Sequence, residues 1–131
     1  MKEQIKKNPF TWVEIYVDNM TRARNFYETV FTIELVPMET PGEFGDLEMM
    51  SFPWAEGEGN ISGALCKTAD MKPSRGGTLI YFTSEDCDVE TSRVEAAGGK
   101  VLQEKQPLGE HGYCSICEDS EGNTIGLHSN K

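Results

Sequence analysis

The sequence predicts an α+β fold in which a βαβββ unit occurs twice along one chain. Three observations support this. In each half, an alternating apolar and polar segment is followed by a segment with helical periodicity and then by three strand-like segments. An offset of 67 residues superimposes the two halves, so that Trp12 coincides with Leu79 and Tyr27 with Val94. A length of 131 residues suits one domain built from two repeated modules that share a core.

The first predicted strand, WVEIYV at 12–17, has two different faces. Alternate side chains of a strand point to opposite sides. The odd-numbered residues are all β-branched and apolar, which suits a core. The even-numbered residues, Trp12, Glu14 and Tyr16, are too polar for a core and too aromatic for open water. We therefore expect this second face to line a ligand cavity.

A helix is predicted next, with Asp18 or Asn19 as its N-cap and apolar residues at intervals of three and four. The apolar positions are Met20, Ala23, Tyr27, Val30 and Phe31. Three further strands are predicted at 33–38, 47–52 and 61–67, with a turn-rich connection after the first of them.

The second half repeats this order after a polar linker. Asp86 or Asp88 can cap the second helix, and the glycines of AAGG at 96–99 suit a left-handed end to it. Gly122, in the turn DSEGN, can take a positive φ. The predicted strands span 78–83, 100–103, 112–117 and 123–128. The expected organisation is an N-terminal tail at 1–10, a first module at 11–70, a linker at 71–77 and a second module at 78–131.

Charge limits the partners of the protein. Its 22 acidic and 12 basic side chains give a net charge of -10, which repels nucleic acids and anionic membranes. The lysine-containing N-terminal segment is not followed by an apolar run long enough for a signal peptide or a membrane span, so we expect a cytoplasmic protein. The four cysteines are expected to be reduced and buried, including the strand-borne pair Cys114 and Cys117.

The chain resembles the vicinal oxygen chelate superfamily, which groups glyoxalase I, extradiol dioxygenases, fosfomycin-resistance enzymes and bleomycin-binding resistance proteins. The resemblance rests on EIYVDNMTRARNFYETVF at 14–31, GGTLIYFTSEDCD at 76–88 with RVEAAGGKVL at 93–102, and EHGYCSICEDSEGNTIGLH at 110–128. It implies paired βαβββ modules whose mixed sheet curls around a cleft, a small-molecule ligand in that cleft, and a homodimer.

Metal-dependent members of this superfamily place a His, Gln or Glu on the first and last strand of each module. By strand alignment these positions fall on Trp12, Ala64, Leu79 and Gly126. None of these four side chains supplies a carboxylate, imidazole or similar donor to a divalent ion. We therefore expect no metal cofactor at the usual positions.

Two residues beyond each of those positions lie Glu14, Cys66, Tyr81 and His128, which we expect to face the cleft. Glu14 and His128 are the candidate catalytic acid/base pair, although the same two residues could instead form a structural pair or lie at a solvated rim. A shifted metal site made of Glu14, Cys66 and His128 is a further alternative. The candidate ligand-binding residues are Trp12, Tyr16, Cys66, Leu79, Tyr81, Tyr113 and Gly126.

Two classes of function follow from this reading. The first is a metal-independent, glyoxalase-like enzyme that uses acid/base chemistry on a small metabolite. The second is a binding protein that sequesters a drug or metabolite, as the bleomycin-binding relatives do. The acidic charge balance favours a basic ligand in the second case.

Overall fold

The structure is a computed structural model that describes residues 9–40, 42–55 and 60–131. Residues 1–8, most of the expected N-terminal tail, lie outside the described residues. The first half contains β1 (Trp12–Tyr16), α1 (Met20–Phe31), β2 (Val36–Met38), the 3-10 helix η1 (Gly42–Phe44), β3 (Glu48–Ser51) and β4 (Ser62–Lys67). The second half contains β5 (Ile80–Thr83), α2 (Cys87–Val94), β6 (Lys100–Pro107), the 3-10 helix η2 (Gly109–His111), β7 (Tyr113–Glu118) and β8 (Thr124–Ser129). The predicted α+β fold with two βαβββ units is confirmed.

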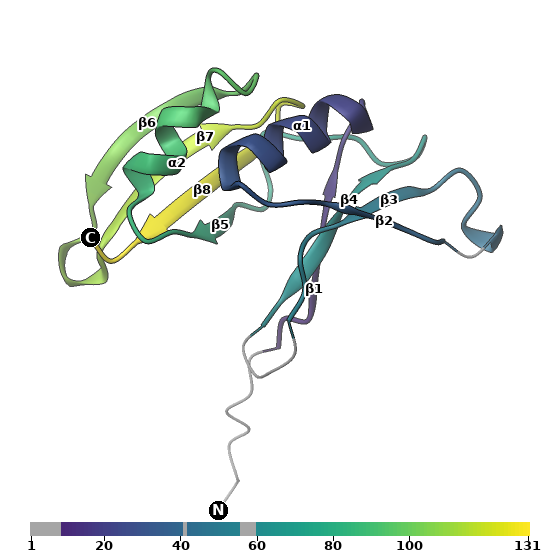
Figure 1. Cartoon of the computed structure of the whole chain (residues 1–131), viewed down its shortest axis with the longest axis horizontal. Coiled ribbons are helices and arrows are strands. Elements are labelled where there is room, and N and C mark those ends of the chain that lie inside the picture. Colours follow the sequence, from purple (N-terminus) through teal and green to yellow (C-terminus); the bar gives the residue numbers. More distant parts are fainter. Residues whose placement is uncertain (1–8, 41, 56–59) are drawn as a thin grey trace, which may run out of the picture.

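The strands form two mixed four-stranded sheets with the same connectivity, in the orders β1-β4-β3-β2 and β5-β8-β7-β6. In each sheet the first strand pairs in parallel with the last, and the other neighbours are antiparallel. The helices α1 and α2 contact each other, and the two sheets diverge beneath them (Figure 1). Strands β1 and β5 therefore form the facing edges of the two sheets.

The helix boundaries follow from local sequence. Asn19 caps α1 by accepting a 3.0 Å hydrogen bond from the Arg22 amide, and Asp86 caps α2 by accepting one from the Asp88 amide at 3.1 Å. These bonds satisfy amides that the first turn of a helix leaves free. Beyond α2, Gly98 adopts a φ of 101°, in the left-handed region predicted for AAGG.

One hydrophobic core joins the two halves. Met20, Ala23, Tyr27 and Val30 are buried on α1 as predicted, and Phe26, which the periodicity did not single out, is fully buried beside them. Aromatic rings then link the modules: Phe31 of α1 lies 4.5 Å from Phe82 of β5, measured between ring centroids. Aromatic pairs of this kind add about 0.5–1.5 kcal/mol beyond the burial of area.

Two strands begin two or three residues later than the sequence predicts. The expected strand at 33–38 is paired only from Val36, because the Leu35 amide donates a 2.8 Å hydrogen bond to the Glu28 carboxylate of α1. That bond ties Leu35 to α1. The strand expected at 78–83 begins at Ile80, where its pairing with Ile125 of β8 starts. Thr78 and Leu79 are exposed at the edge facing β1.

The turn between β7 and β8 fixes the second module against the first. Glu121 in this turn accepts hydrogen bonds from the amides of Asp18 and Asn19, at 2.9 and 2.8 Å, and from the Arg22 guanidinium at 2.6 Å. Asn123 donates a 2.8 Å hydrogen bond to the Tyr16 carbonyl oxygen. These bonds set how the end of β1 lies relative to the second sheet.

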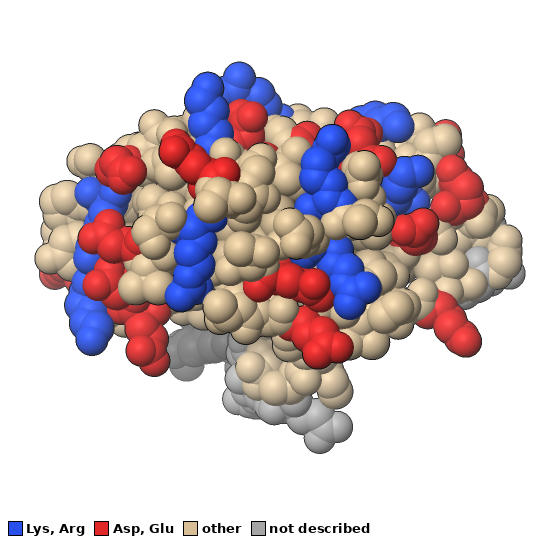
Figure 2. All heavy atoms as spheres, turned by 45° about the horizontal axis from the view of Figure 1, so that its top comes forward, with Lys and Arg blue, Asp and Glu red and all other residues tan. Residues whose placement is uncertain are grey.

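The face that comes forward in Figure 2 carries acidic and basic side chains interspersed with one another. The negative charge of the chain is thus partly compensated by nearby basic groups on this face. No helix within the described residues has the length and apolar character that a membrane span requires. The four cysteines are buried free thiols, as the sequence analysis predicted.

Candidate functional site at the edge between the sheets

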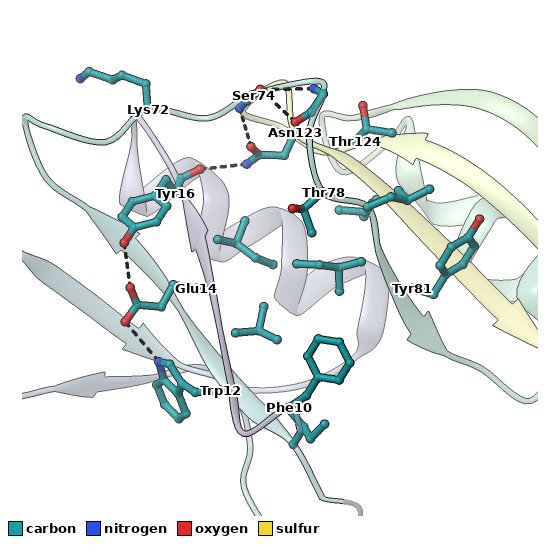
Figure 3. A pocket seen from close by; sticks show the side chains of 18 residues that line it. Phe10, Trp12, Glu14, Tyr16, Lys72, Ser74, Thr78, Tyr81, Asn123 and Thr124 are labelled. Carbon is teal, nitrogen blue, oxygen red and sulfur yellow. Dashed lines mark hydrogen bonds between the residues drawn. The ribbon is translucent and has the colours of Figure 1, made fainter. Parts of the chain in front are cut away.

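Two aromatic side chains on one face of β1 are hydrogen-bonded to a single carboxylate on the same face. The Trp12 indole Nε1–H donates to Glu14 Oε2 at 3.2 Å, and the Tyr16 hydroxyl donates to Glu14 Oε1 at 2.7 Å. Figure 3 shows the two rings on either side of Glu14. The alternation of the strand places these residues on one face, as predicted. We call this group the β1 triad.

Within the β1 triad, the pKa of Tyr16 is raised. The hydrogen bond to Glu14, partial burial and the negative charge of Glu14 raise the pKa of Tyr16 to about 12. Tyr16 is therefore a protonated donor near neutral pH, with Glu14 as its acceptor. Cys66 lies opposite Tyr16 on β4, where burial and then the Glu14 charge raise the pKa of its thiol to about 12. A thiol with such a pKa is protonated and a poor nucleophile near neutral pH.

A cavity of about 770 Å³ lies between β1 and β5. Aliphatic side chains from both strands and from β8 line it, including Val13, Ile15, Ile80 and Ile125. Five predicted residues also line it: Trp12, Glu14, Tyr16, Leu79 and Tyr81. The β1 triad lies on the side of β1 away from β5, and Tyr81 lies on the far side of β5 (Figure 3). These residues thus form two opposite rims of the cavity.

Gly126 is not itself a lining residue, but it determines how Tyr81 lies. The two residues are register partners on β5 and β8. A Cβ atom added at Gly126 would overlap the Tyr81 ring, so the ring can occupy this position only because residue 126 has no side chain. The predicted contribution of Gly126 to the site is therefore indirect, through the position of an aromatic rim residue that is 49% exposed.

His128 does not meet Glu14 within one chain. It lies on β8, opposite Thr83 and Cys114, and its Nε2 is 2.7 Å from the His111 carbonyl oxygen. Glu14 is bonded instead to Trp12 and Tyr16. The structure also keeps Tyr113 apart from the cavity: Lys105 lies over its ring, 4.7 Å from the centroid. Cys66 and His128 are likewise outside the lining.

The positions that the superfamily resemblance predicts for metal ligands do not offer donors to a divalent ion. Trp12, Ala64, Leu79 and Gly126 carry an indole, a methyl group, an isobutyl group and a hydrogen atom, none of which is a metal donor. Within the described residues, no three or more His, Cys, Asp and Glu side chains are grouped so as to hold a metal. The alternative set Glu14, Cys66 and His128 is therefore not assembled in this chain.

Sequence reasoning missed several lining residues. Phe10, assigned to the tail, lines the cavity, and so do Thr78 and Lys72 from the linker side and Asn123 from the turn before β8. Asn123 also accepts a 2.8 Å hydrogen bond from the Ser74 amide, which holds the linker beside β1. In the sequence, Asn123 is marked only by its position directly after the turn residue Gly122. That position does not predict a hydrogen bond to Tyr16, which is 107 residues earlier in the chain.

The comparisons with known proteins agree on one family. Residues 10–127 match the family model described as Glyoxalase/Bleomycin resistance protein/Dioxygenase superfamily. A Mycobacterium bovis protein described as "Putative glyoxylase CFP32" is 23% identical over 131 residues, covering 96% of this chain and 47% of the relative. Crystal structures of a V278E glyoxalase I mutant from Zea mays and of a glyoxalase-related enzyme from Fulvimarina pelagi match with TM-scores of 0.73 and 0.68.

The two structural relatives are 20% and 14% identical to this chain, so they show the fold. The maize match covers 93% of this chain and 46% of the maize chain, and the Fulvimarina match covers 96% and 89%. The chain thus spans about half the length of the mycobacterial and maize relatives. The family match, the paired βαβββ sheets and the shared topology establish that this chain belongs to the glyoxalase/bleomycin resistance protein/dioxygenase superfamily.

Proposed function

We propose that this protein binds a small organic molecule in the cavity between β1 and β5. The observation that carries the proposal is the cavity itself, which joins an apolar lining to the β1 triad at its rim. A volume of about 770 Å³ lies within the range of typical small-molecule sites. Such sites combine an apolar lining with a few placed polar groups.

The test uses two leucines that are matched in exposure, Leu79 at the cavity and Leu102 on β6, at 40% and 39%. Leu79→Arg should fill the cavity, whereas Leu102→Arg introduces the same side chain elsewhere. NMR chemical-shift mapping with a panel of small aromatic compounds should place the perturbed amides along β1 and β5. Leu79→Arg should abolish these shifts and Leu102→Arg should retain them. Equal behaviour of the two variants would refute the proposed location.

We propose that binding does not require a metal ion. The donor chemistry supports this, because the four usual positions offer no ligands and the alternative set is not assembled. Recognition would then depend on hydrogen bonding, apolar contact and charge. Treatment with a chelator should therefore leave ligand affinity unchanged.

We propose a homodimer in which a second copy packs along the edge strands β1 and β5 and encloses the cavity together with its bound ligand. Strands β1 and β5 each lie at the end of their sheet order, so neither has a strand neighbour toward the cavity. Large apolar residues gather there with exposed fractions from 38% to 71%: Phe10, Trp12, Ile61, Leu79 and Tyr81. Unpaired edges and clustered exposed apolar groups mark association surfaces. Light scattering should give twice the chain mass, and Leu79→Arg should shift it toward one chain mass.

Catalysis by proton transfer is the second candidate function. It is favoured by the 2.7 Å contact between Tyr16 and Glu14, which provides a donor and an acceptor on one exposed face. The predicted partner His128 would have to come from another copy or remain uninvolved, because its own chain does not bring it to Glu14. If Glu14→Gln and His128→Ala abolish turnover of a bound compound but leave its affinity intact, the result favours an enzymatic function over simple binding. Effects confined to affinity favour a binding protein.

The four buried free thiols also support a cytoplasmic location, which we propose for the chain. Cell fractionation against a cytosolic marker tests it, and recovery in a secreted fraction would contradict it.

A further inference from the structure

We infer that the β1 triad selects an organic cation, an amine or quaternary ammonium group attached to an apolar or aromatic body. This inference rests on the proposed function, since it assigns a ligand class to the same cavity. It is carried by the juxtaposition of a carboxylate without a charged partner and two partly exposed aromatic rings that are held beside it.

Glu14 has an uncompensated negative charge. Its carboxylate is exposed, and both hydrogen bonds to it come from neutral donors, an indole and a phenol. The ion pairs between described residues join other carboxylates to Lys, Arg or His, and none includes Glu14. A carboxylate has about four acceptor positions, so two donated hydrogen bonds leave it able to bind a further donor.

The basic side chain that lines the same cavity is directed elsewhere. Lys72 lies 3.6 Å from Asp18, measured between Nζ and Oδ1, and therefore pairs with an acid outside the lining. Glu14 and Lys72 are the charged residues among those that line the cavity. The rim at β1 consequently presents negative charge, and the net charge of -10 adds to the repulsion of anions.

The two rings supply the second element of cation recognition. Trp12 is 39% exposed, and Tyr16 is partly exposed on the same face. Their hydrogen bonds to Glu14 turn the N–H and O–H edges of the two rings toward the carboxylate (Figure 3). The alkyl groups of an ammonium group bound to Glu14 would therefore have to extend over a ring face to gain a cation–π contact. Tryptophan and tyrosine rings attract cations through their quadrupoles. Aliphatic side chains line the cavity from the other face of β1, so a ligand body that passes the edge of this strand meets apolar surface.

Isothermal titration calorimetry can test this with three probes of similar size and different charge: benzyltrimethylammonium, benzyl alcohol and benzenesulfonate. The variant is Glu14→Gln, which keeps a side chain able to accept hydrogen bonds but removes the charge. The matched control is Glu48→Gln, an exposed carboxylate on β3 of the same sheet that does not line the cavity. Thermal unfolding of both variants checks that they fold.

The inference predicts that the cation binds at least tenfold more tightly than the alcohol and that the sulfonate does not bind. Glu14→Gln should weaken cation binding tenfold or more, with benzyl alcohol affected less than twofold. Glu48→Gln should change neither affinity more than twofold. Trp12→Phe, which keeps a ring but removes the N–H donor, should retain most of the cation affinity, and Trp12→Leu should lose it.

Two outcomes overturn the inference in distinguishable ways. If the cation and the alcohol bind equally, or Glu14→Gln binds the cation as the wild type does, the ligand class is wrong while small-molecule binding stands. If none of the probes binds, the ligand class is also refuted, and the comparison of Leu79→Arg with Leu102→Arg decides the proposed function separately.

Discussion

The Tyr16 hydroxyl donates a 2.7 Å hydrogen bond to Glu14, two positions earlier on the same strand. Because both residues lie on one face of β1, the strand itself creates this contact. The bond keeps the proton on Tyr16 and the negative charge on Glu14. It also raises the pKa of Tyr16, and the dependence of that pKa on Glu14 can be measured.

The first prediction concerns this pair. Replacing Glu14 by Gln should bring the pKa of Tyr16 down from about 12 toward the ordinary value near 10, because the strong hydrogen bond to a carboxylate is lost and a neutral amide does not repel a phenolate. Phenolate absorbance during an alkaline titration measures the change, and Tyr16→Phe identifies which transition belongs to this residue. A raised folded-state pKa contributes stability below about pH 10 that is lost as the pH rises toward about 12. An unchanged titration in Glu14→Gln would show that Glu14 is not the cause.

The second prediction concerns the turn between β7 and β8. Glu121→Ala should reduce the free energy of unfolding by about 2–3 kcal/mol, because charge-assisted hydrogen bonds to α1 are lost and amides are left unpaired. Urea unfolding measures this. The exposed Glu48→Gln serves as the control and should change stability by less than about 0.5 kcal/mol.

The same carboxylate gives a pH dependence with a definite sign. Burial by itself would raise the pKa of Glu121, but Arg22, the Asn19 amide and other donors outweigh it, and the net pKa is lowered. The stability from this group is therefore present above the unfolded value of about 4.3 and lost as the pH falls through the lower folded value. The gap between the wild type and Glu121→Gln should narrow on acidification. A gap that widens would contradict this assignment.

The third prediction concerns the space that Gly126 gives to Tyr81. Gly126→Ala should destabilise the wild-type chain by about 1 kcal/mol, because the added methyl group displaces the ring. In a Tyr81→Ala background the same substitution should cost much less. A double-mutant cycle measured by urea unfolding gives the coupling free energy. Additive effects would show that the ring does not depend on Gly126.

The fourth prediction concerns metal dependence. Treatment with a chelator should leave the apparent melting temperature and probe affinity unchanged, because the usual ligand positions carry no donor groups. A series of divalent ions should give no thermal shift, since only a ligand bound to the folded state raises apparent stability. Near-stoichiometric metal by elemental analysis, together with stabilisation by that metal, would contradict the prediction.

Local sequence was enough to predict much of the fold and the shared face of Trp12, Glu14 and Tyr16. Alternation placed Trp12, Glu14 and Tyr16 together, since the direction of a side chain along a strand follows from a period of two. The repeated βαβββ pattern identified both sheets. The strand expected to begin at 33 was predicted less well, because the Leu35 amide bonds to the Glu28 side chain, and a side-chain partner of this kind leaves no periodic signal.

The sequence by itself determined the two-module fold, the buried free cysteines and the composition of the β1 triad, all of which depend on local pattern or residue chemistry. Tertiary structure decided which faces meet. Glu14 and His128 lie on strands of different sheets, so their separation depends on the packing of α1 against α2 and on the Glu121 and Asn123 bonds. Phe10 and Asn123 entered the cavity lining for the same reason: long-range packing brings distant segments together, and periodicity does not encode it.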